Sequence, residues 1–259
     1  MTSSVEALAG SLGGGKPVFT AWCGLPEPFV AGHLAREAGF GAVVLDLQHG
    51  AIDFLSATRA IALVAAAGKP CLPRIPVGDF ATGSRLLDAG ASGLIAPMIN
   101  TAEQARRFAA FSKFPPAGER SWGPHPALAL TGLPAAEYFR TANGFVRTFA
   151  MIETCEALDA IDEILAPDGI DAIFIGPSDL SVALSNGAAL DPNSAEVEAA
   201  IDHALARTRA AGKIAGIYAP TGEKAADYAR LGYDLVAIGS DLSFLRLGAA
   251  TMLKAAGTA

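Results

Sequence analysis

A (β/α)8 barrel is the fold class that this sequence of 259 residues predicts. Eight short, uniformly apolar runs recur along the chain, and each is followed by a turn and a segment with helical periodicity. Five of the seven intervals between their starts lie between 21 and 29 residues, which is room for one strand, one loop and one helix. Such runs are typical of a parallel sheet covered on both faces. Eight of them fit a closed barrel better than an open sheet.

The predicted strands are separated by helical segments, five of which stop at a glycine shortly before the next strand. Glycine suits the left-handed conformation that commonly ends a helix. The five glycines are Gly39, Gly68, Gly90, Gly212 and Gly232. In chain order, the strands are expected at Pro17–Trp22, Ala42–Asp46, Cys71–Arg74, Gly93–Pro97, Arg147–Glu153, Ile170–Gly176, Ile214–Tyr218 and Leu235–Gly239.

Two intervals are longer than one strand–helix unit and must hold additional structure. The fourth spans 54 residues and the sixth spans 44. The fourth contains a Pro/Gly-rich stretch from Phe114 to Pro126 that cannot continue a helix. We expect a lid or an oligomer-contact loop at about residues 114–146. It belongs to a single barrel domain covering residues 1–259, because no linker or shift in composition marks a second domain.

The composition is that of an acidic globular protein. The chain has 19 Lys+Arg against 26 Asp+Glu, a net charge of -7, which argues against a nucleic-acid or anionic-membrane partner. No apolar run reaches the ~18 residues needed to span a bilayer. The first residues lack a secretory signal pattern, and the three cysteines are scattered and odd in number. A cytoplasmic location is therefore expected.

Polar residues at the predicted strand ends are the functional candidates, because active sites in such barrels lie at the carboxyl ends of the strands. Four ends carry them. They are Asp46-Leu47-Gln48-His49-Gly50, Pro73-Arg74, Ile152-Glu153-Thr154 and Gly176-Pro177-Ser178-Asp179. Their convergence on one mouth would bring two carboxylates, one imidazole and one guanidinium together.

Glu153 and Asp179 follow neighbouring strands and form an oxygen-only pair. With no His or Cys beside them, they suit Mg²⁺ or Mn²⁺ with water in the remaining positions. The ligand spacing of a Cys/His zinc site is absent. The alternative interpretation is that each carboxylate only caps a helix. We favour the metal.

His49 lies just past a strand end in a glycine-flanked loop, where its imidazole could act as a general base. A nearby carboxylate would hold its tautomer, and Asp46 and Asp88 are both candidates. Arg74 could bind a developing oxyanion with its five donors, or close an ion pair at the barrel rim. The other histidines are expected to be structural, in helices or in the long loop: His33, His203 and His125.

Several cofactor chemistries lack the residues they need. A Schiff-base enzyme needs a lysine projecting from a strand into the mouth. Lys16, Lys69 and Lys213 precede strands, and the other three lysines fall in helices or loops. The segment 10–16 imitates a P-loop, but Pro17 takes the place of the required Ser or Thr. No G-x-G-x-x-G or G-x-S-x-G pattern occurs, so we expect neither nicotinamide nor a nucleophile elbow. Without a lysine in the mouth, pyridoxal phosphate is not expected either.

Five motifs occur in order along the chain: Asp46-Leu47-Gln48-His49-Gly50, Leu87-Asp88-Ala89-Gly90-Ala91, Pro115-Pro116-Ala117-Gly118-Glu119-Arg120-Ser121, Ile152-Glu153-Thr154 and Gly176-Pro177-Ser178-Asp179-Leu180-Ser181. Together they resemble the metal-dependent class II pyruvate aldolases, which include 4-hydroxy-2-oxoheptanedioate and 2-keto-3-deoxyglucarate aldolases. The similarity runs from Trp22 to Asp241. It is greatest to members that use hydroxypyruvate or pyruvate as donor. Two positions depart from the pattern: Gln48 stands where Glu is expected, and Met151 where Gln usually precedes I-E-T.

The resemblance implies a TIM barrel of the phosphoenolpyruvate/pyruvate-binding type and a homo-oligomer, usually a hexamer in which the last helix packs on a neighbour. It implies a divalent cation, Mg²⁺, Mn²⁺ or Co²⁺, held by Glu153 and Asp179. It also implies that His49 is the base, that Asp88 is its partner in a dyad, and that Arg74 stabilises an enolate.

The hypothesis is a carbon–carbon lyase that joins the enolate of pyruvate or hydroxypyruvate to an aldehyde. In reverse it would cleave a 4-hydroxy-2-oxoacid or a 2-keto sugar acid. Backbone N–H groups around Gly176, Pro177 and Ser178 are expected to bind the donor carboxylate. Trp22, at the end of the first strand, lines the donor pocket or belongs to the core. Tyr218 could contact the aldehyde.

Three alternatives stay open on the sequence. One is a metal-free isomerase or synthase with a phosphate site at Gly239-Ser240-Asp241. A second is a non-catalytic barrel that binds a 2-oxoacid, although such a binder needs no base. The third is a metal-dependent acyl-CoA lyase of the malyl or citramalyl type.

Overall fold

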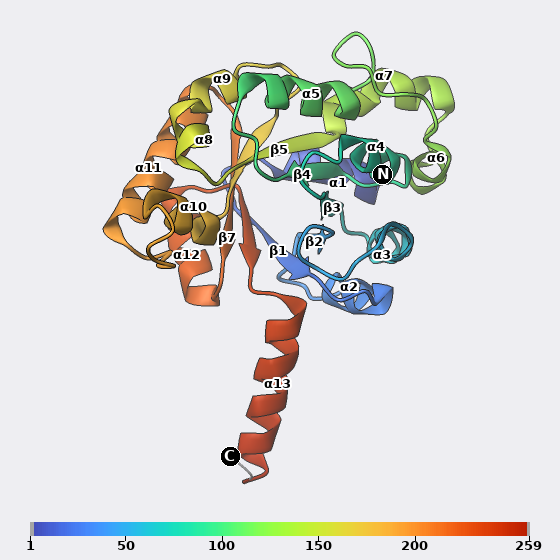
Figure 1. Cartoon of the computed structure of the whole chain (residues 1–259). Coiled ribbons are helices and arrows are strands. Elements are labelled where there is room, and N and C mark those ends of the chain that lie inside the picture. The colour runs from blue at the N-terminus through green and yellow to red at the C-terminus, as the bar shows by residue number, and fades with distance from the viewer. Residues whose placement is uncertain (1–2, 258–259) are drawn as a thin grey trace.

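The predicted closed barrel is confirmed by the computed structural model, which describes residues 3–257. Eight parallel strands follow one another in chain order around the barrel, and pairing of the first strand with the last closes it (Figure 1). The ends of the predicted strands differ from the observed ones by at most two residues. The strands are β1 (Val18–Cys23), β2 (Ala42–Asp46), β3 (Cys71–Arg74), β4 (Gly93–Ala96), β5 (Arg147–Ile152), β6 (Ala172–Ile175), β7 (Ile214–Ala219) and β8 (Leu235–Ile238).

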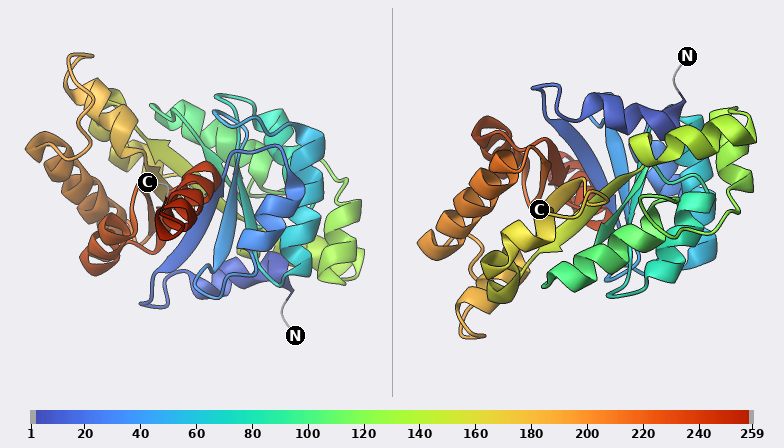
Figure 2. Two further views of the ribbon diagram at one scale, coloured as in Figure 1. Left: turned by 90° about the horizontal axis from the view of Figure 1, so that it is seen from below. Right: turned by 90° about the horizontal axis from the view of Figure 1, so that it is seen from above.

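Helices surround the barrel, as both views in Figure 2 show. Most of them begin at a capped residue near the mouth and return to the base, as in a right-handed β-α-β unit. Their bounds are α1 (Ser4–Ser11), α2 (Pro28–Leu34), α3 (Phe54–Ala66), α4 (Phe80–Asp88), α5 (Ala102–Ser112), α6 (His125–Thr131), α7 (Ala135–Phe145), α8 (Cys155–Asp159), α9 (Ile161–Leu165), α10 (Pro177–Leu184), α11 (Ala195–Ala210), α12 (Gly222–Leu231) and α13 (Asp241–Ala255).

The core has two layers, because neighbouring side chains of a strand point to opposite faces of the sheet. In β5, Phe149 and Met151 belong to the cluster inside the barrel, whereas Ala150 and Ile152 belong to the cluster between strands and helices. Leu8 of α1 joins the interior cluster beside the first residues of β1 and β8. Helix α1 therefore covers the base of the barrel and leaves the opposite end, the mouth, for a site.

The segment predicted as a lid or contact loop at about residues 114–146 contains two helices, α6 and α7. Both contact α1 at the base, and none of their residues lines the pocket at the mouth. The segment therefore does not cover the mouth of its own chain, and a role as a lid on, or a contact with, a neighbouring subunit stays a prediction. His125, expected in a loop, begins α6. The proline-rich stretch misled the prediction because proline is well tolerated in the first turn of a helix.

Helix α13 departs from the ring of helices and extends away from the barrel (Figure 1). Along its length, only Asp241 is buried. Exposed apolar side chains include those of Leu242, Leu245, Leu247 and Met252. Among residues 3–257, none of the helices combines the length and hydrophobicity needed to cross a bilayer.

A buried lysine connects α5 to the bases of β5 and β6. The Nζ atom of Lys113 donates to Asp171 Oδ2 at 2.7 Å and to the Val146 carbonyl oxygen at 2.6 Å. Lys113 is 2% exposed, and burial lowers its pKa although the charge of Asp171 opposes this. The same Oδ2 accepts hydrogen bonds from the backbone and the hydroxyl of Thr148, both at 2.9 Å. The pair therefore fixes the register of two strands at their first residues.

We expect Lys113→Met to lower the free energy of unfolding by about 3 kcal/mol, because it leaves the Asp171 carboxylate largely buried without its main cation. Urea denaturation measures this. Lys224→Met is the matched control, since Lys224 pairs with a half-exposed Glu198 at 3.4 Å and such pairs contribute under about 1 kcal/mol. Equal effects of the two substitutions would contradict the structural role of Lys113.

Candidate active site

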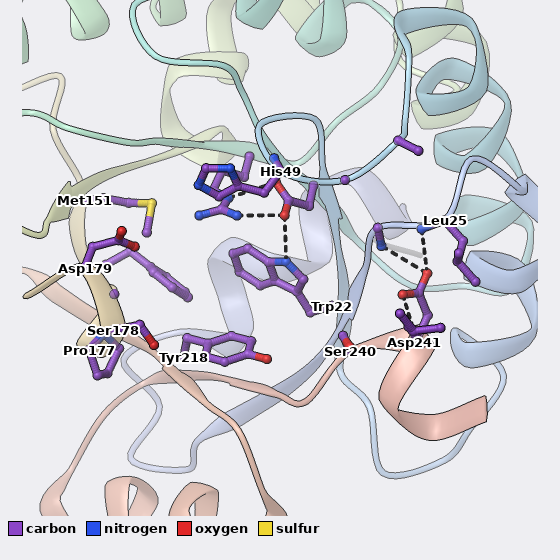
Figure 3. Close-up of a pocket in the computed structure, with 18 residues that line it drawn as sticks. Trp22, Leu25, His49, Met151, Pro177, Ser178, Asp179, Tyr218, Ser240 and Asp241 are labelled. Carbon is purple, nitrogen blue, oxygen red and sulfur yellow. Dashed lines mark hydrogen bonds and ion pairs between the residues drawn. The ribbon is translucent and has the colours of Figure 1, made fainter. Parts of the chain in front are cut away.

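A pocket of about 390 Å³ opens at the mouth of the barrel, on the carboxyl ends of the strands (Figure 3). Its volume is within the range of small-molecule sites. It collects side chains that are far apart in the sequence. The lining residues are Trp22, Gly24, Leu25, Asp46, His49, Gly50, Ala51, Arg74, Met151, Phe174, Gly176, Pro177, Ser178, Asp179, Tyr218, Ser240, Asp241 and Leu242.

A bidentate ion pair lies at the floor of this pocket. Arg74 donates from Nε to Asp46 Oδ1 at 2.9 Å and from Nη2 to Oδ2 at 2.7 Å. The indole N–H of Trp22 donates to the same Oδ2 at 3.3 Å, and the guanidinium lies 4.8 Å from the centre of the indole ring. Burial acts to raise the pKa of Asp46, but the hydrogen bonds and charge of Arg74 outweigh it and hold that pKa below its ordinary value. The guanidinium is thus locked in one orientation, with Nη1 free of hydrogen-bond partners among the described residues.

The same carboxylate shapes the turn that carries His49. Asp46 Oδ1 accepts from the backbone N–H of Gln48 at 3.0 Å and of His49 at 3.2 Å. Gly50 closes the turn against the loop after β1, because a Cβ there would lie 2.3 Å from the Asp46 carbonyl oxygen and 2.8 Å from the Cα of Gly24. The His49 imidazole is left exposed at the mouth.

Neither predicted carboxylate contacts the imidazole of His49. Asp46 binds the backbone of the turn and the guanidinium of Arg74 instead. Asp88 is the last residue of α4, which runs from the mouth end of β3 back toward the start of β4. It pairs with Arg120 at 2.7 Å and lines a separate groove near Phe54. Within one chain, the structure therefore does not bring Asp88 and His49 together as the predicted dyad requires.

The predicted metal ligands Glu153 and Asp179 do lie together. Glu153 is 2% exposed, and its Oε2 accepts the backbone N–H of Met98 at 3.0 Å. Burial raises the pKa of Glu153 to about 7, and the negative charge of Asp179 acts in the same direction. Gly176 makes room for this carboxylate, because a Cβ there would lie 2.8 Å from Glu153 Oε1. A buried carboxylate that faces a second carboxylate favours a cation between them.

Glu153 and Asp179 would offer two protein carboxylates to a cation at this place. Within residues 3–257, no group of three or more His, Cys, Asp or Glu side chains has the geometry of a metal site. Mg²⁺ is commonly held by one or two carboxylates, with water and substrate oxygens completing its coordination. The oxygen-only donor set fits Mg²⁺ or Mn²⁺ and does not fit a structural zinc site.

The N-terminus of α10 opens into the pocket next to Asp179. Its N-cap residue is Gly176, and no side chain caps the helix. Pro177 occupies the first position, so the first free N–H groups belong to Ser178 and Asp179. Figure 3 shows Pro177, Ser178 and Asp179 together on one side of the pocket. Uncapped N–H groups and the positive end of the helix dipole suit a carboxylate.

Asp241, which the sequence suggested only as part of a phosphate site, has a different place. Its Oδ2 accepts the backbone N–H groups of Gly24 at 3.0 Å and Leu25 at 2.9 Å, and the residue is 2% exposed. It thereby fixes the loop after β1 to the start of α13. A phosphate at this helix N-terminus would meet the Asp241 carboxylate, which counts against the phosphate-site alternative.

Aromatic side chains form the wall between the Asp179 side and the Asp241 side of the pocket (Figure 3). The ring of Trp22 lies 5.7 Å from that of Phe174 and 5.5 Å from that of Tyr218, centre to centre. Trp22 lines the pocket and also belongs to the buried cluster inside the barrel, and Tyr218 lines the pocket as well. Which substrate Trp22 contacts stays a prediction.

Comparison with known proteins places this geometry in a family. The model of the HpcH/HpaI aldolase/citrate lyase family matches residues 20–246. The chain belongs to this family. It is therefore an aldolase, a carbon–carbon lyase.

Relatives of this HpcH/HpaI family member match over nearly their whole length. A hydroxypyruvate/pyruvate aldolase of Rhizorhabdus wittichii is 40% identical over 91% of this chain and 92% of its own. A 4-hydroxy-2-oxo-heptane-1,7-dioate aldolase of Salmonella typhimurium is 35% identical over 94% of this chain and 92% of its own. The crystal structure of a family protein from Burkholderia cenocepacia has a TM-score of 0.87 and 28% identity, covering 97% of this chain and 99% of the other. The resemblance stated from the sequence motifs is confirmed.

The two departures from the motif pattern have different surroundings in this aldolase. Met151 is buried and lines the pocket, and its Cε would lie 3.4 Å from a Cβ at Gly176. The side-chain oxygen of Gln48 is buried without a hydrogen-bond partner among the described residues. Met151 therefore changes the wall beside Glu153, whereas Gln48 does not line the pocket.

The ion pair at the pocket floor makes a stability prediction for this aldolase. Asp46→Ala leaves the 7%-exposed Arg74 without a counter-charge and removes the acceptor of the His49 turn. We expect the free energy of unfolding to fall by about 3–5 kcal/mol in urea denaturation.

The matched control is Asp53→Ala, which removes an exposed N-cap that accepts the Ser56 N–H at 2.7 Å. A cap of this kind contributes about 1 kcal/mol. If Asp46→Ala were no more destabilising than Asp53→Ala, the ion pair would not hold the mouth together.

Proposed function

We propose that this aldolase is divalent-metal-dependent and that it joins the enolate of pyruvate or hydroxypyruvate to an aldehyde, or cleaves the corresponding 4-hydroxy-2-oxoacid. One observation carries the proposal: the buried Glu153 faces Asp179 beside the uncapped N-terminus of α10. A cation site and a carboxylate site thus lie side by side. The Rhizorhabdus relative, a hydroxypyruvate/pyruvate aldolase, supports the choice of donor.

Glu153 and Asp179 would hold the cation, with Mg²⁺ and Mn²⁺ as the first candidates and Co²⁺ as a further one. When bound, the cation supplies Lewis-acid polarisation of the donor's keto group. The N–H groups of Ser178 and Asp179 bind the donor carboxylate and set its orientation. This placement leaves the C3 carbon of the donor directed into the pocket, toward the residues from β2 and β3.

His49 is the general base in this proposal. Its exposed imidazole, on the turn fixed by Asp46, removes a proton from C3. Arg74 donates from Nη1 to the oxygen on which the enolate charge develops. The bidentate ion pair with Asp46 holds the guanidinium in position for this. The enolate C3 then forms a bond with the aldehyde carbon as the carbon–oxygen π bond breaks, and the new alkoxide takes up a proton. Cleavage reverses these steps.

Deuterium exchange at C3 of pyruvate tests the proposal without an assumed aldehyde. The protein is incubated in D₂O with EDTA, then with Mn²⁺ or Mg²⁺, and followed by NMR. We expect exchange only with the cation present. Undiminished exchange in EDTA would refute the requirement for a metal. If no exchange occurred under any of these conditions, enolate chemistry would be refuted.

His49→Ala should reduce the exchange rate by roughly 10²- to 10⁴-fold, the usual contribution of a general base. His125→Ala is the matched control, because His125 is exposed at the base of the barrel and lines no part of the pocket. Near wild-type exchange in His49→Ala would eliminate His49 as the base.

Glu153→Gln should abolish stabilisation by Mn²⁺. At about 100 times the Kd, a ligand stabilises the folded state by about 2.7 kcal/mol, or roughly 5–10 °C in melting temperature for a chain of this size. Differential scanning fluorimetry should show this increase for the wild type and for the control Glu156→Gln, whose carboxylate is exposed on α8. An unchanged Mn²⁺ response in Glu153→Gln would place the cation elsewhere.

We also propose that the enzyme works in the cytoplasm as a homo-oligomer. Cys23, Cys71 and Cys155 are all free thiols, which suits a reducing compartment. The family resemblance supports a hexamer, and light scattering that gave a monomer would refute it.

A further inference from the structure

The donor proposed above uses only part of the pocket. Its partners come from β2, β3, β5 and the start of α10. Most of the remaining lining comes from β1 and its loop, from β7 and from the start of α13: Trp22, Gly24, Leu25, Tyr218, Ser240, Asp241 and Leu242. Because the aldehyde must approach C3 from the unoccupied side, this second half of the pocket is the acceptor side.

Among the described residues of one chain, no unpaired lysine or arginine lines the acceptor side of the pocket. Arg74 is the one Lys or Arg side chain among the described lining residues, and Asp46 neutralises it. Asp179 and Asp241 add two negative charges, and Glu153 lies just behind Gly176. A divalent cation cancels two of these three carboxylates, and the donor's own carboxylate adds another negative charge. A second substrate carboxylate would therefore enter a site that is already negative.

In the described part of the chain, the backbone N–H groups on the acceptor side are no substitute for a cation, because other groups of the chain already bind them. The N–H groups of Gly24 and Leu25 are both taken by Asp241 Oδ2. At the start of α13, Leu242 N–H donates to Asp241 Oδ1 at 2.8 Å, and Ser243 N–H donates to the capping hydroxyl of Ser240 at 3.2 Å. Both groups of donors that could have bound a carboxylate are thus already paired within the chain.

Apolar surface dominates what remains. Trp22 and Tyr218 meet edge to face at 5.5 Å. Leu25, in the loop after β1, and Leu242, in the first turn of α13, also line the pocket. The phenol of Tyr218 is a neutral hydrogen-bond donor at pH 7, as tyrosine ordinarily is, and burial raises its pKa further. An aromatic wall with one hydroxyl suits an uncharged ligand that has a hydrophobic body.

We infer that the aldehyde acceptor is uncharged and carries an apolar or aromatic group, and that semialdehydes with a carboxylate are disfavoured. This inference rests on the proposed function and adds the class of the second substrate. The reaction is unchanged: the donor C3 bonds to the aldehyde carbon, whose oxygen gains a proton.

A matched pair of acceptors tests it with the full-length enzyme, pyruvate and Mn²⁺. The probes are 4-oxobutanoate and 4-methylpentanal, in which an isopropyl group replaces the carboxylate. We expect kcat/KM to be roughly 10-fold or more higher for the neutral aldehyde, because juxtaposed like charges are costly. Raising the salt concentration should narrow this ratio by screening the repulsion. Equal or better use of 4-oxobutanoate would overturn the inference.

A variant provides the converse test. Leu242→Lys places a cation at the acceptor side, on a residue that is 54% exposed. It should raise kcat/KM for 4-oxobutanoate several-fold. Leu245→Lys, at an equally exposed position of α13 outside the pocket, is the control and should leave the preference unchanged. An increase in both variants, or in neither, would contradict the assignment of the acceptor side.

Deuterium exchange at C3 distinguishes failure of this inference from failure of the proposed enolate chemistry, because the exchange needs no acceptor. Normal metal-dependent exchange together with a preference for 4-oxobutanoate would overturn this inference alone. Absence of exchange would instead overturn the proposed enolate chemistry.

Discussion

The bidentate pair of Asp46 and Arg74 is the interaction on which the mouth of the barrel depends. It joins the ends of two neighbouring strands, accepts the indole N–H of Trp22 from a third, and shapes the turn that carries His49. Removing either charge would leave the other buried without compensation. The Asp46 carboxylate therefore orients the indole of Trp22, the guanidinium of Arg74 and the turn that carries the imidazole of His49.

The opposite side of the mouth is organised by a charge imbalance instead. Glu153 is buried, and its raised pKa reflects first the loss of water and then the proximity of Asp179. The nearby helix start has no side-chain cap, and its N–H groups have positive character. A pair of carboxylates that favours a cation thus lies beside a helix N-terminus that favours an anion. These two features support the proposal that a 2-oxoacid and a divalent cation bind together here, with the aldehyde on the apolar side.

Much of this could be predicted from the sequence because a parallel barrel brings the ends of all its strands to one face. The strand spacing predicted the fold, and Trp22, His49, Arg74, Glu153 and Asp179 all reach the mouth or lie directly beside it. The partners of these residues were harder to predict. Asp88 belongs to a helix whose end lies away from the mouth, and the sequence motif alone does not show this. The contact of Asp241 with Gly24 and Leu25 joins the two ends of the chain, which only closure of the barrel brings together.

The central claim is that a divalent cation and a 2-oxoacid bind between Glu153, Asp179 and the start of α10. Anomalous diffraction from crystals soaked with Mn²⁺ and pyruvate tests it most directly. The account predicts one manganese peak contacted by both carboxylates, with the pyruvate carboxylate at the N–H groups of Ser178 and Asp179. A manganese peak elsewhere, or pyruvate bound with its carboxylate beside Asp241, would contradict it.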